Sequence, residues 1–167
     1  MAKVAILCEK YVHDLELLYP KYRLLEAGHK VTIVGIEKIK YTGKHGASIQ
    51  ADVSIDSVSA KDFDALVIPG GWAPDYLRIN TKVLQLVEEM NKQKKPIAAI
   101  CHGGWVLASA KILKGRTATC FVAIKDDLIN AGANYLDKDV VVDGNLITSR
   151  TPDDLPAFMI ELLKKLK

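Results

Sequence analysis

The stretch from Lys95 to Gly115 limits the possible folds of this chain more than any other part of the sequence. Pro96 to Ile100 is a short apolar run led by a proline, which is typical of a buried strand. Val106 to Leu113 has apolar residues at helical spacing, and Gly115 is predicted to end that helix. Cys101 to Gly104 form the turn between them. A strand that turns this abruptly into a helix is expected to point its turning side chain, here a cysteine, out of the sheet.

This arrangement is that of a nucleophile elbow, with sulfur in place of the usual serine oxygen. The positive end of the helix is expected to lower the pKa of Cys101. Nearby backbone N–H groups could stabilise an oxyanion. The alternative is an ordinary buried cysteine after a strand, but a core cysteine does not need His102, Gly103 and Gly104 behind it.

The rest of the chain alternates between strand and helix patterns. Continuous apolar runs predict buried strands over 4–8, 31–35 and 65–68, and helical spacing predicts helices over 15–26 and 81–94. Their order predicts right-handed βαβ units and an α/β sandwich with a mostly parallel sheet. The strand ends at Cys8-Glu9, Pro69-Gly71 and Ile100-Cys101 are then expected to meet at one crevice, where ligands bind in such sheets.

Shorter elements are predicted from local signals. A small hairpin or edge strands are expected within 36–63, a short strand over 116–121 and a short helix over 126–131. Asp143-Gly144 predicts a hairpin between strands over 140–142 and 146–149. Thr151 is expected to cap a helix that runs to about Lys165, with Pro152 at its first position.

The composition is typical of a small globular protein. With 167 residues and 49% hydrophobic content, the chain is expected to form a single domain over 1–167. The net charge of +3 is small, and the 7% of aromatic residues are not interleaved with basic ones, so neither nucleic acid nor membrane is expected as a partner. The three cysteines are too few and too widely spaced for a disulfide framework. The N-terminal apolar run is too short for a secretion signal or a membrane span, so a cytoplasmic protein is predicted.

Several motifs, in this order and spacing, resemble the ThiJ/PfpI superfamily over essentially the whole chain, and its PfpI branch in particular. The resemblance depends on Asp14-Leu15-Glu16 with Tyr19-Pro20, Gly43-Lys44-His45-Gly46, Asp62 to Gly71, Ala99 to Gly103, Lys125-Asp126-Asp127, and Val142 to Asn145 with Thr148-Ser149-Arg150. It implies a flavodoxin-like three-layer α/β/α sandwich of the class I glutamine amidotransferase-like type, with a nucleophile elbow.

The resemblance also implies roles for individual residues. Cys101 matches the nucleophile, and Glu16 matches a glutamate that hydrogen-bonds this cysteine. Two acidic groups in contact titrate as a pair, so a protonated Glu16 could donate to the sulfur and later act as a general acid. Gly71 and His102 match the positions whose N–H groups form the oxyanion hole. Asp75 matches an acid that a neighbouring subunit supplies to His102, which implies a homo-oligomer, a dimer building to a hexamer.

Other residues are expected to shape the pocket next to Gly70. His13 stands where close relatives carry a glutamate, and Phe121 replaces a tyrosine. Trp72 and Trp105 are expected near the crevice, either narrowing it or packing at a subunit interface. His13 and Glu16 are three residues apart and could join Cys101 at a metal, but this spacing is generic, so no metal or cofactor is predicted.

Three functions remain open from the sequence. The first is an enzyme that uses Cys101 on small aldehydes or glycated substrates through a hemithioacetal, which the resemblance implies to be glyoxalase or deglycase activity. The second is a peptidase or amidase in which Cys101, His102 and Asp75 cooperate. The third is a redox sensor or stress chaperone without enzymatic activity.

Overall fold

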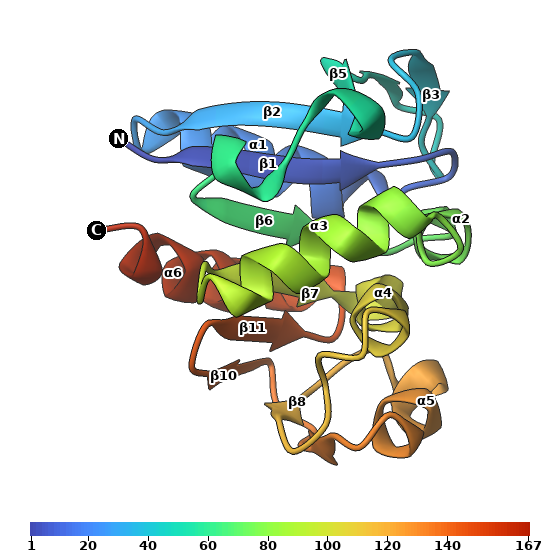
Figure 1. Cartoon of the computed structure of the whole chain (residues 1–167), viewed down its shortest axis with the longest axis vertical. Helices are drawn as coiled ribbons and strands as arrows, with labels where there is room; N and C mark the ends of the chain where they lie inside the picture. Colours follow the sequence, from blue (N-terminus) through green and yellow to red (C-terminus); the bar gives the residue numbers. More distant parts are fainter.

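The computed structural model describes all residues, 1–167, and contains one seven-stranded sheet. Its strands, in spatial order, are β10 (Val140–Asp143), β11 (Leu146–Ser149), β7 (Ile97–Ile100), β6 (Ala65–Ile68), β1 (Lys3–Cys8), β2 (Lys30–Gly35) and β5 (Val53–Ser54). Every neighbouring pair is parallel except β10 with β11. The carboxyl ends of the parallel strands therefore share one edge (Figure 1).

Helices cover both faces of this sheet, which confirms the predicted α/β/α sandwich (Figure 1). On one face lie α2 (Ala73–Leu77), α3 (Thr81–Lys92) and α4 (Gly104–Ser109), and on the other lie α1 (Asp14–Glu26) and α6 (Leu155–Lys165). Short α5 (Lys125–Asn130) packs beside α4. Two small sheets complete the fold: the antiparallel hairpin of β3 (Lys40–Thr42) and β4 (Ser48–Gln50), and the parallel pair of β8 (Thr117–Ala118) and β9 (Asn134–Tyr135).

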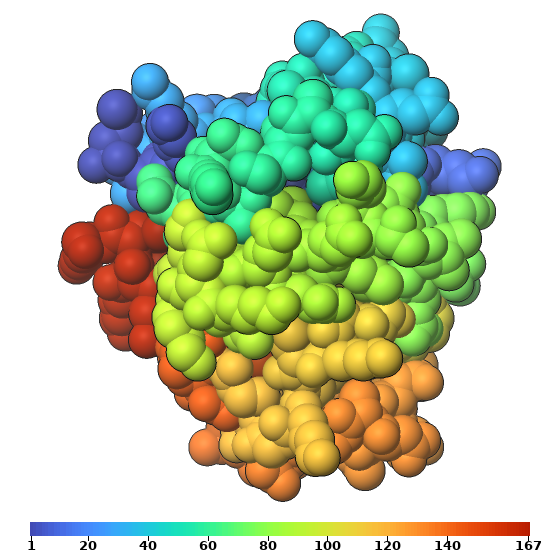
Figure 2. Space-filling view, in the orientation of Figure 1, coloured from blue at the N-terminus to red at the C-terminus, as the bar shows by residue number.

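The central strands are apolar because both of their faces are covered. Residues 4–8 of β1 and all residues of β6 and β7 are at most 1% exposed. Such continuous apolar runs bury side chains against the helices on either side. The two ends of the chain pack into one body, and Figure 2 shows the earlier and later halves in direct contact on the face that it draws.

Two local predictions were wrong. Helix α4 ends at Ser109 and not at Leu113, and Lys111 (φ 56°) turns the chain after it. Ile112 and Leu113 are nevertheless buried, at 8% and 0% exposure. These two residues are apolar because they are buried in the core, although they are not part of a helix. Gly115 therefore lies in a later turn and does not end the helix.

Thr151 precedes α6 as predicted but does not cap it. A 3-10 turn over Pro152–Asp154 comes first, and the Thr151 side chain makes no capping hydrogen bond. The carboxylate of Asp154 instead accepts hydrogen bonds from the side chain of Arg150. Thr151 lines the cavity described next.

Candidate active site

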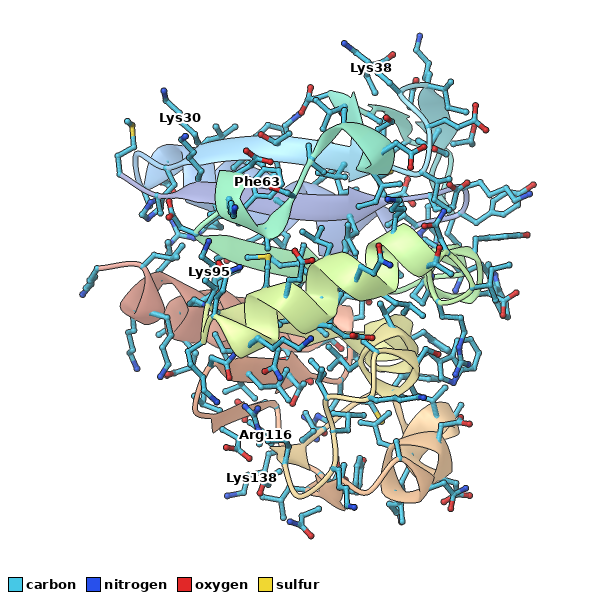
Figure 3. All side chains as sticks on the ribbon, in the orientation of Figure 1. Lys30, Lys38, Phe63, Lys95, Arg116 and Lys138 are labelled. Carbon is cyan, nitrogen blue, oxygen red and sulfur yellow. The ribbon has the colours of Figure 1, made fainter.

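The predicted crevice is a cavity at the carboxyl ends of the central strands. Its volume is about 420 Å³, within the range of small-molecule sites. The lining residues are His13, Glu16, Lys44, Gly71, Trp72, Cys101, His102, Phe121, Ala123, Thr151 and Pro152. A more open hollow of about 640 Å³ is lined by Arg116 (labelled in Figure 3), Lys94, Lys165 and neighbours, and its lining contains no cysteine, serine, threonine or histidine. The Cys101 cavity is therefore the candidate active site.

Cys101 occupies the predicted elbow. It follows β7 directly, has a φ of 58°, and starts a 3-10 turn that leads into α4. A positive φ is strained for a residue with a side chain, and such strain is typical of functional turns. Gly103 is needed here because a Cβ at this position would lie 2.5 Å from the carbonyl oxygen of Ile68. The thiol is 8% exposed, so it reaches the cavity while staying mostly buried.

Glu16 lies beneath this thiol and is fully buried. Its Oε2 accepts a hydrogen bond of 2.7 Å from the backbone N–H of Gly70, and its Oε1 has no hydrogen-bond partner of ordinary geometry. Burial raises the pKa of Glu16 to about 7, against the smaller lowering effects of the Gly70 N–H and the Cys101 thiol. The carboxyl group therefore gains and loses its proton near neutral pH. Gly70 must be a glycine, since a Cβ there would lie 2.6 Å from Oε2.

The pKa of Cys101 is raised, whereas the sequence predicts a lowered value. Burial, followed by the negative charge of Glu16, raises it to about 12, and the N–H groups of His102 and Gly71 only partly offset this. The helix end was expected to lower this pKa, but burial of the thiol and the nearby carboxylate of Glu16, on α1, outweigh that effect. When Glu16 is protonated its repulsion disappears and its O–H can donate to the sulfur, so thiol and carboxyl titrate as a coupled pair.

His102 contacts the thiol directly. Its Nδ1 lies 3.3 Å from the Cys101 sulfur. The ring is stacked on Phe121 (centroids 5.1 Å apart) and edge-on to Trp105 (5.1 Å), with Trp72 at 6.2 Å. Burial in this aromatic cage, and then the charge of Lys44, lower the pKa of His102. A neutral imidazole beside a thiol can accept its proton.

His13 lies at the opposite wall of the cavity, in the position just before α1. Its ring meets that of His45 edge-on, with centroids 4.7 Å apart, and its Nδ1 is buried without a hydrogen-bond partner. Burial and the neighbouring His45 and Lys44 lower its pKa. No group of three or more His, Cys, Asp and Glu side chains in the chain is arranged to hold a metal ion.

Three of the predicted site residues do not line the cavity: Gly70, Asp75 and Trp105. Gly70 acts from behind the cavity, where its N–H holds Glu16. Asp75 is exposed on α2 and makes no hydrogen bond through its side chain. Trp105 packs against His102 from outside, and its indole N–H donates to Asp127 at 3.0 Å. Within one chain, His102 therefore has no acidic partner.

Lys44 and Thr151 also line the cavity, and sequence reasoning did not assign them to it. Lys44 belongs to the Gly43–Gly46 turn that contributed to the resemblance, so a signal was present. Its Nζ is 5.9 Å from the Trp72 ring centroid.

None of the helices combines the length and apolar character needed to span a bilayer.

Comparisons with known proteins agree with this geometry. The model of the "DJ-1/PfpI family" matches residues 2–165. "Deglycase PfpI" of Pyrococcus furiosus is 48% identical over 165 residues, covering 99% of this chain and 99% of that protein. "Putative cysteine protease YraA" of Bacillus subtilis is 46% identical over 166 residues, covering 99% and 98%.

A solved structure is similar over the same span. The crystal structure of a two-domain protein containing DJ-1/ThiJ/PfpI-like and ferritin-like domains from Anabaena variabilis has a TM-score of 0.97 and 48% identity. The match covers 99% of this chain and 48% of that one, so this chain spans about half the length of the two-domain protein. Together with the elbow and the sheet, these matches confirm the predicted family: the chain belongs to the DJ-1/PfpI family.

Proposed function

We propose that this chain is a cysteine-dependent enzyme that acts on small reactive carbonyls or their glycated adducts, a glyoxalase or deglycase. The observation that carries the proposal is the pairing of the Cys101 thiol with a buried Glu16 whose pKa is about 7, at the floor of a small cavity. Such a pair can exchange a proton with a substrate at neutral pH. The printed name of the Pyrococcus furiosus relative, a deglycase, supports the same reaction class.

With methylglyoxal as substrate, the proposed reaction begins when Cys101 loses its proton to Glu16 or His102. The sulfur attacks the aldehyde carbon, a sulfur–carbon bond forms, and the carbonyl electron pair moves to oxygen, which takes up a proton to give a hemithioacetal. In this proposal the N–H groups of Gly71 and His102, which lie against the Cys101 sulfur, stabilise the oxygen while it is negative. Proton transfer from the first to the second carbon gives a thioester, and water hydrolyses it to lactate and the free thiol. The net change is addition of one water, so no external oxidant or reductant is required.

The deciding experiment measures lactate from methylglyoxal in an amine-free buffer, because buffer amines trap the aldehyde. Wild type is expected to form lactate and Cys101→Ala is not. Cys120→Ala is the matched control, since Cys120 is a buried free cysteine that does not line the cavity. Absence of lactate from wild type would refute the glyoxalase proposal.

A cysteine peptidase is the second candidate. The 3.3 Å contact between the Cys101 sulfur and His102 Nδ1 favours it, because a cysteine–histidine pair can also form an acyl-enzyme with an amide. Peptide-amide hydrolysis lost in Cys101→Ala, without lactate formation by wild type, would favour this candidate. For a redox-sensing role, mass spectrometry after mild peroxide is expected to show Cys101 oxidised before Cys8 and Cys120, which are 0% and 1% exposed.

The exposed Asp75 supports the proposal of a homo-oligomer. Its carboxylate has no partner within the chain, and His102 has no acid. A neighbouring copy that brought Asp75 to His102 would satisfy both. Sedimentation velocity tests for the oligomer, and Asp75→Asn is expected to lower kcat only if the oligomer forms.

A further inference from the structure

Lys44 faces the Cys101 cavity as an unpaired cation. Its ammonium group makes no ion pair and no hydrogen bond within the chain, and its nearest recorded interaction is with the Trp72 ring, 5.9 Å away. The positive charge of Lys44 acts on three other residues of the cavity, because it contributes to lowering the pKa of His13, His102 and Glu16. An exposed lysine that lines the cavity without a counter-ion is available to a ligand.

The backbone of Lys44 is held firmly in this place. Its N–H donates to the carbonyl oxygen of Val12 at 2.8 Å. The buried carboxylate of Asp14 accepts hydrogen bonds of 2.7 Å from the N–H groups of both His45 and Ala47. Gly43 packs so closely on Asp14 that a Cβ would lie 2.6 Å from the carboxylate. The β3–β4 turn is thus clamped onto α1, and only the side chain of Lys44 remains free to move.

Two further polar groups in the cavity have no partner. Thr151 lines the cavity and its side chain makes no capping hydrogen bond, and His13, also in the lining, has a buried Nδ1 without a hydrogen-bond partner. Buried polar atoms are costly when they are left unsatisfied. The only acid in the lining is Glu16, and its Oε2 is already occupied by the Gly70 N–H. The cavity therefore offers hydrogen-bond partners and one positive charge without a full negative charge to balance it.

We propose that Lys44, Thr151 and His13 form a subsite for a small carboxylate next to Cys101, so that the preferred carbonyl substrates carry a negative charge close to the electrophilic carbon. The inference rests on the proposed function in that the same cavity takes the substrate. An uncharged dicarbonyl would leave Lys44 unused, whereas a carbonyl compound or adduct with a free carboxylate would pair with it. The subsite thus selects small acids, including glycated free amino acids, over neutral aldehydes.

The test uses two alkylating agents of nearly equal size, iodoacetate and iodoacetamide. Iodoacetate carries the carboxylate that the subsite is proposed to bind, and iodoacetamide carries an uncharged amide in its place. With either one, the Cys101 sulfur displaces iodide: a sulfur–carbon bond forms, the carbon–iodine bond breaks, and the thiol proton leaves to solvent. Mass spectrometry gives the second-order rate at Cys101 for each agent. A change in the reactivity of the thiol itself alters both rates equally and cancels in their ratio. The same ratio measured for 2-mercaptoethanol is the reference for a thiol without a subsite.

The iodoacetate-to-iodoacetamide ratio of wild type is expected to exceed that of 2-mercaptoethanol by about fivefold, the size of effect that a partly exposed ion pair supplies. Lys44→Met is expected to abolish the excess, Lys44→Glu to push the ratio below the reference, and Lys44→Arg to keep it. Lys125→Met is the matched control, because Lys125 also lies over an aromatic ring, 5.5 Å from the Tyr135 centroid, but outside the cavity. About 1 M salt is expected to reduce the excess by screening.

A wild-type ratio equal to that of 2-mercaptoethanol would overturn the proposal, as would a raised ratio that Lys44→Met leaves unchanged. Unchanged iodoacetamide rates in the Lys44 variants show that Cys101 and the fold are intact. Alkylation needs no turnover, so the subsite and the proposed enzymatic function are tested separately. A protein that forms no lactate but shows the Lys44-dependent ratio retains the subsite and loses only the proposed reaction.

Discussion

Replacing Glu16 by glutamine is expected to change how the stability of the protein depends on pH. Glutamine keeps the volume of the side chain, and its amide oxygen can still accept the N–H of Gly70, but it cannot ionise. In the wild type, burial raises the pKa of Glu16 from its ordinary value of 4.5 to about 7. The folded protein therefore holds a proton on Glu16 between these values, where the unfolded chain has lost it.

The sign and size of the effect follow from proton linkage. Because the native state binds more protons than the unfolded state between pH 4.5 and about 7, the free energy of unfolding falls as pH rises through this window. At about 1.4 kcal/mol per pH unit, the full loss is roughly 3 kcal/mol. Glu16→Gln has no such loss, so it is expected to gain up to roughly 3 kcal/mol relative to wild type between pH 4.5 and pH 8.

Guanidinium unfolding at a series of pH values from about 4.5 to 8, followed by circular dichroism, measures this difference. The upper limit keeps the Cys101 thiol protonated in the folded state, since its pKa is about 12. Glu37→Gln, on an exposed residue, is the control and is expected to follow the wild-type curve. If the wild-type and Glu16→Gln curves run parallel, Glu16 is not the proton-binding group that the geometry describes.

Three further outcomes are expected. Gly70→Ala places a Cβ 2.7 Å from the Cβ of Cys101 and should destabilise the fold by about 1–3 kcal/mol, seen in chemical unfolding, while slowing alkylation of the thiol. Asp14→Asn removes a carboxylate that accepts two backbone hydrogen bonds, and it should cost about 1–3 kcal/mol at pH 7 but less in acid, where the wild type loses the same charge; denaturation at both pH values checks this. Phe121→Ala opens the His102 ring to water, so an NMR titration should show the imidazole pKa rise toward its ordinary value, and an unshifted titration would contradict burial as the cause.

The sequence predicted the elements whose pattern is local. The central strands β1, β6 and β7 were recognisable because they are buried on both faces, so residues 4–8, 65–68 and 97–100 are all apolar. The elbow at Cys101 was recognisable because a strand, two glycines and a helix follow one another without a gap. The turn at Asp143-Gly144 was found for the same reason, since its residue types determine its geometry.

The features that the sequence did not predict depend on contacts between residues far apart in the chain. The pKa of Cys101 is raised by burial and then by Glu16, 85 positions earlier, and that of Glu16 is raised by the depth at which α1 packs. Lys44 is an ordinary loop lysine in the sequence, and it becomes a cavity residue only because Asp14 holds the β3–β4 turn against α1. The end of α4 was missed because Leu113 is buried by the core and not by a helix face. Such tertiary effects leave no pattern in a single sequence.

The aromatic cage of His102 has a consequence for experiments on this protein. The chain has two tryptophans, Trp72 and Trp105, and both indoles border the same imidazole. All of its tryptophan emission therefore comes from two indoles whose rings lie 6.2 and 5.1 Å from the imidazole that contacts the Cys101 sulfur, so no added label is needed. A proton gained by His102, a ligand beside Lys44 or an adduct on Cys101 would each alter the surroundings of these two indoles, so the protein carries its own optical reporter of the candidate site.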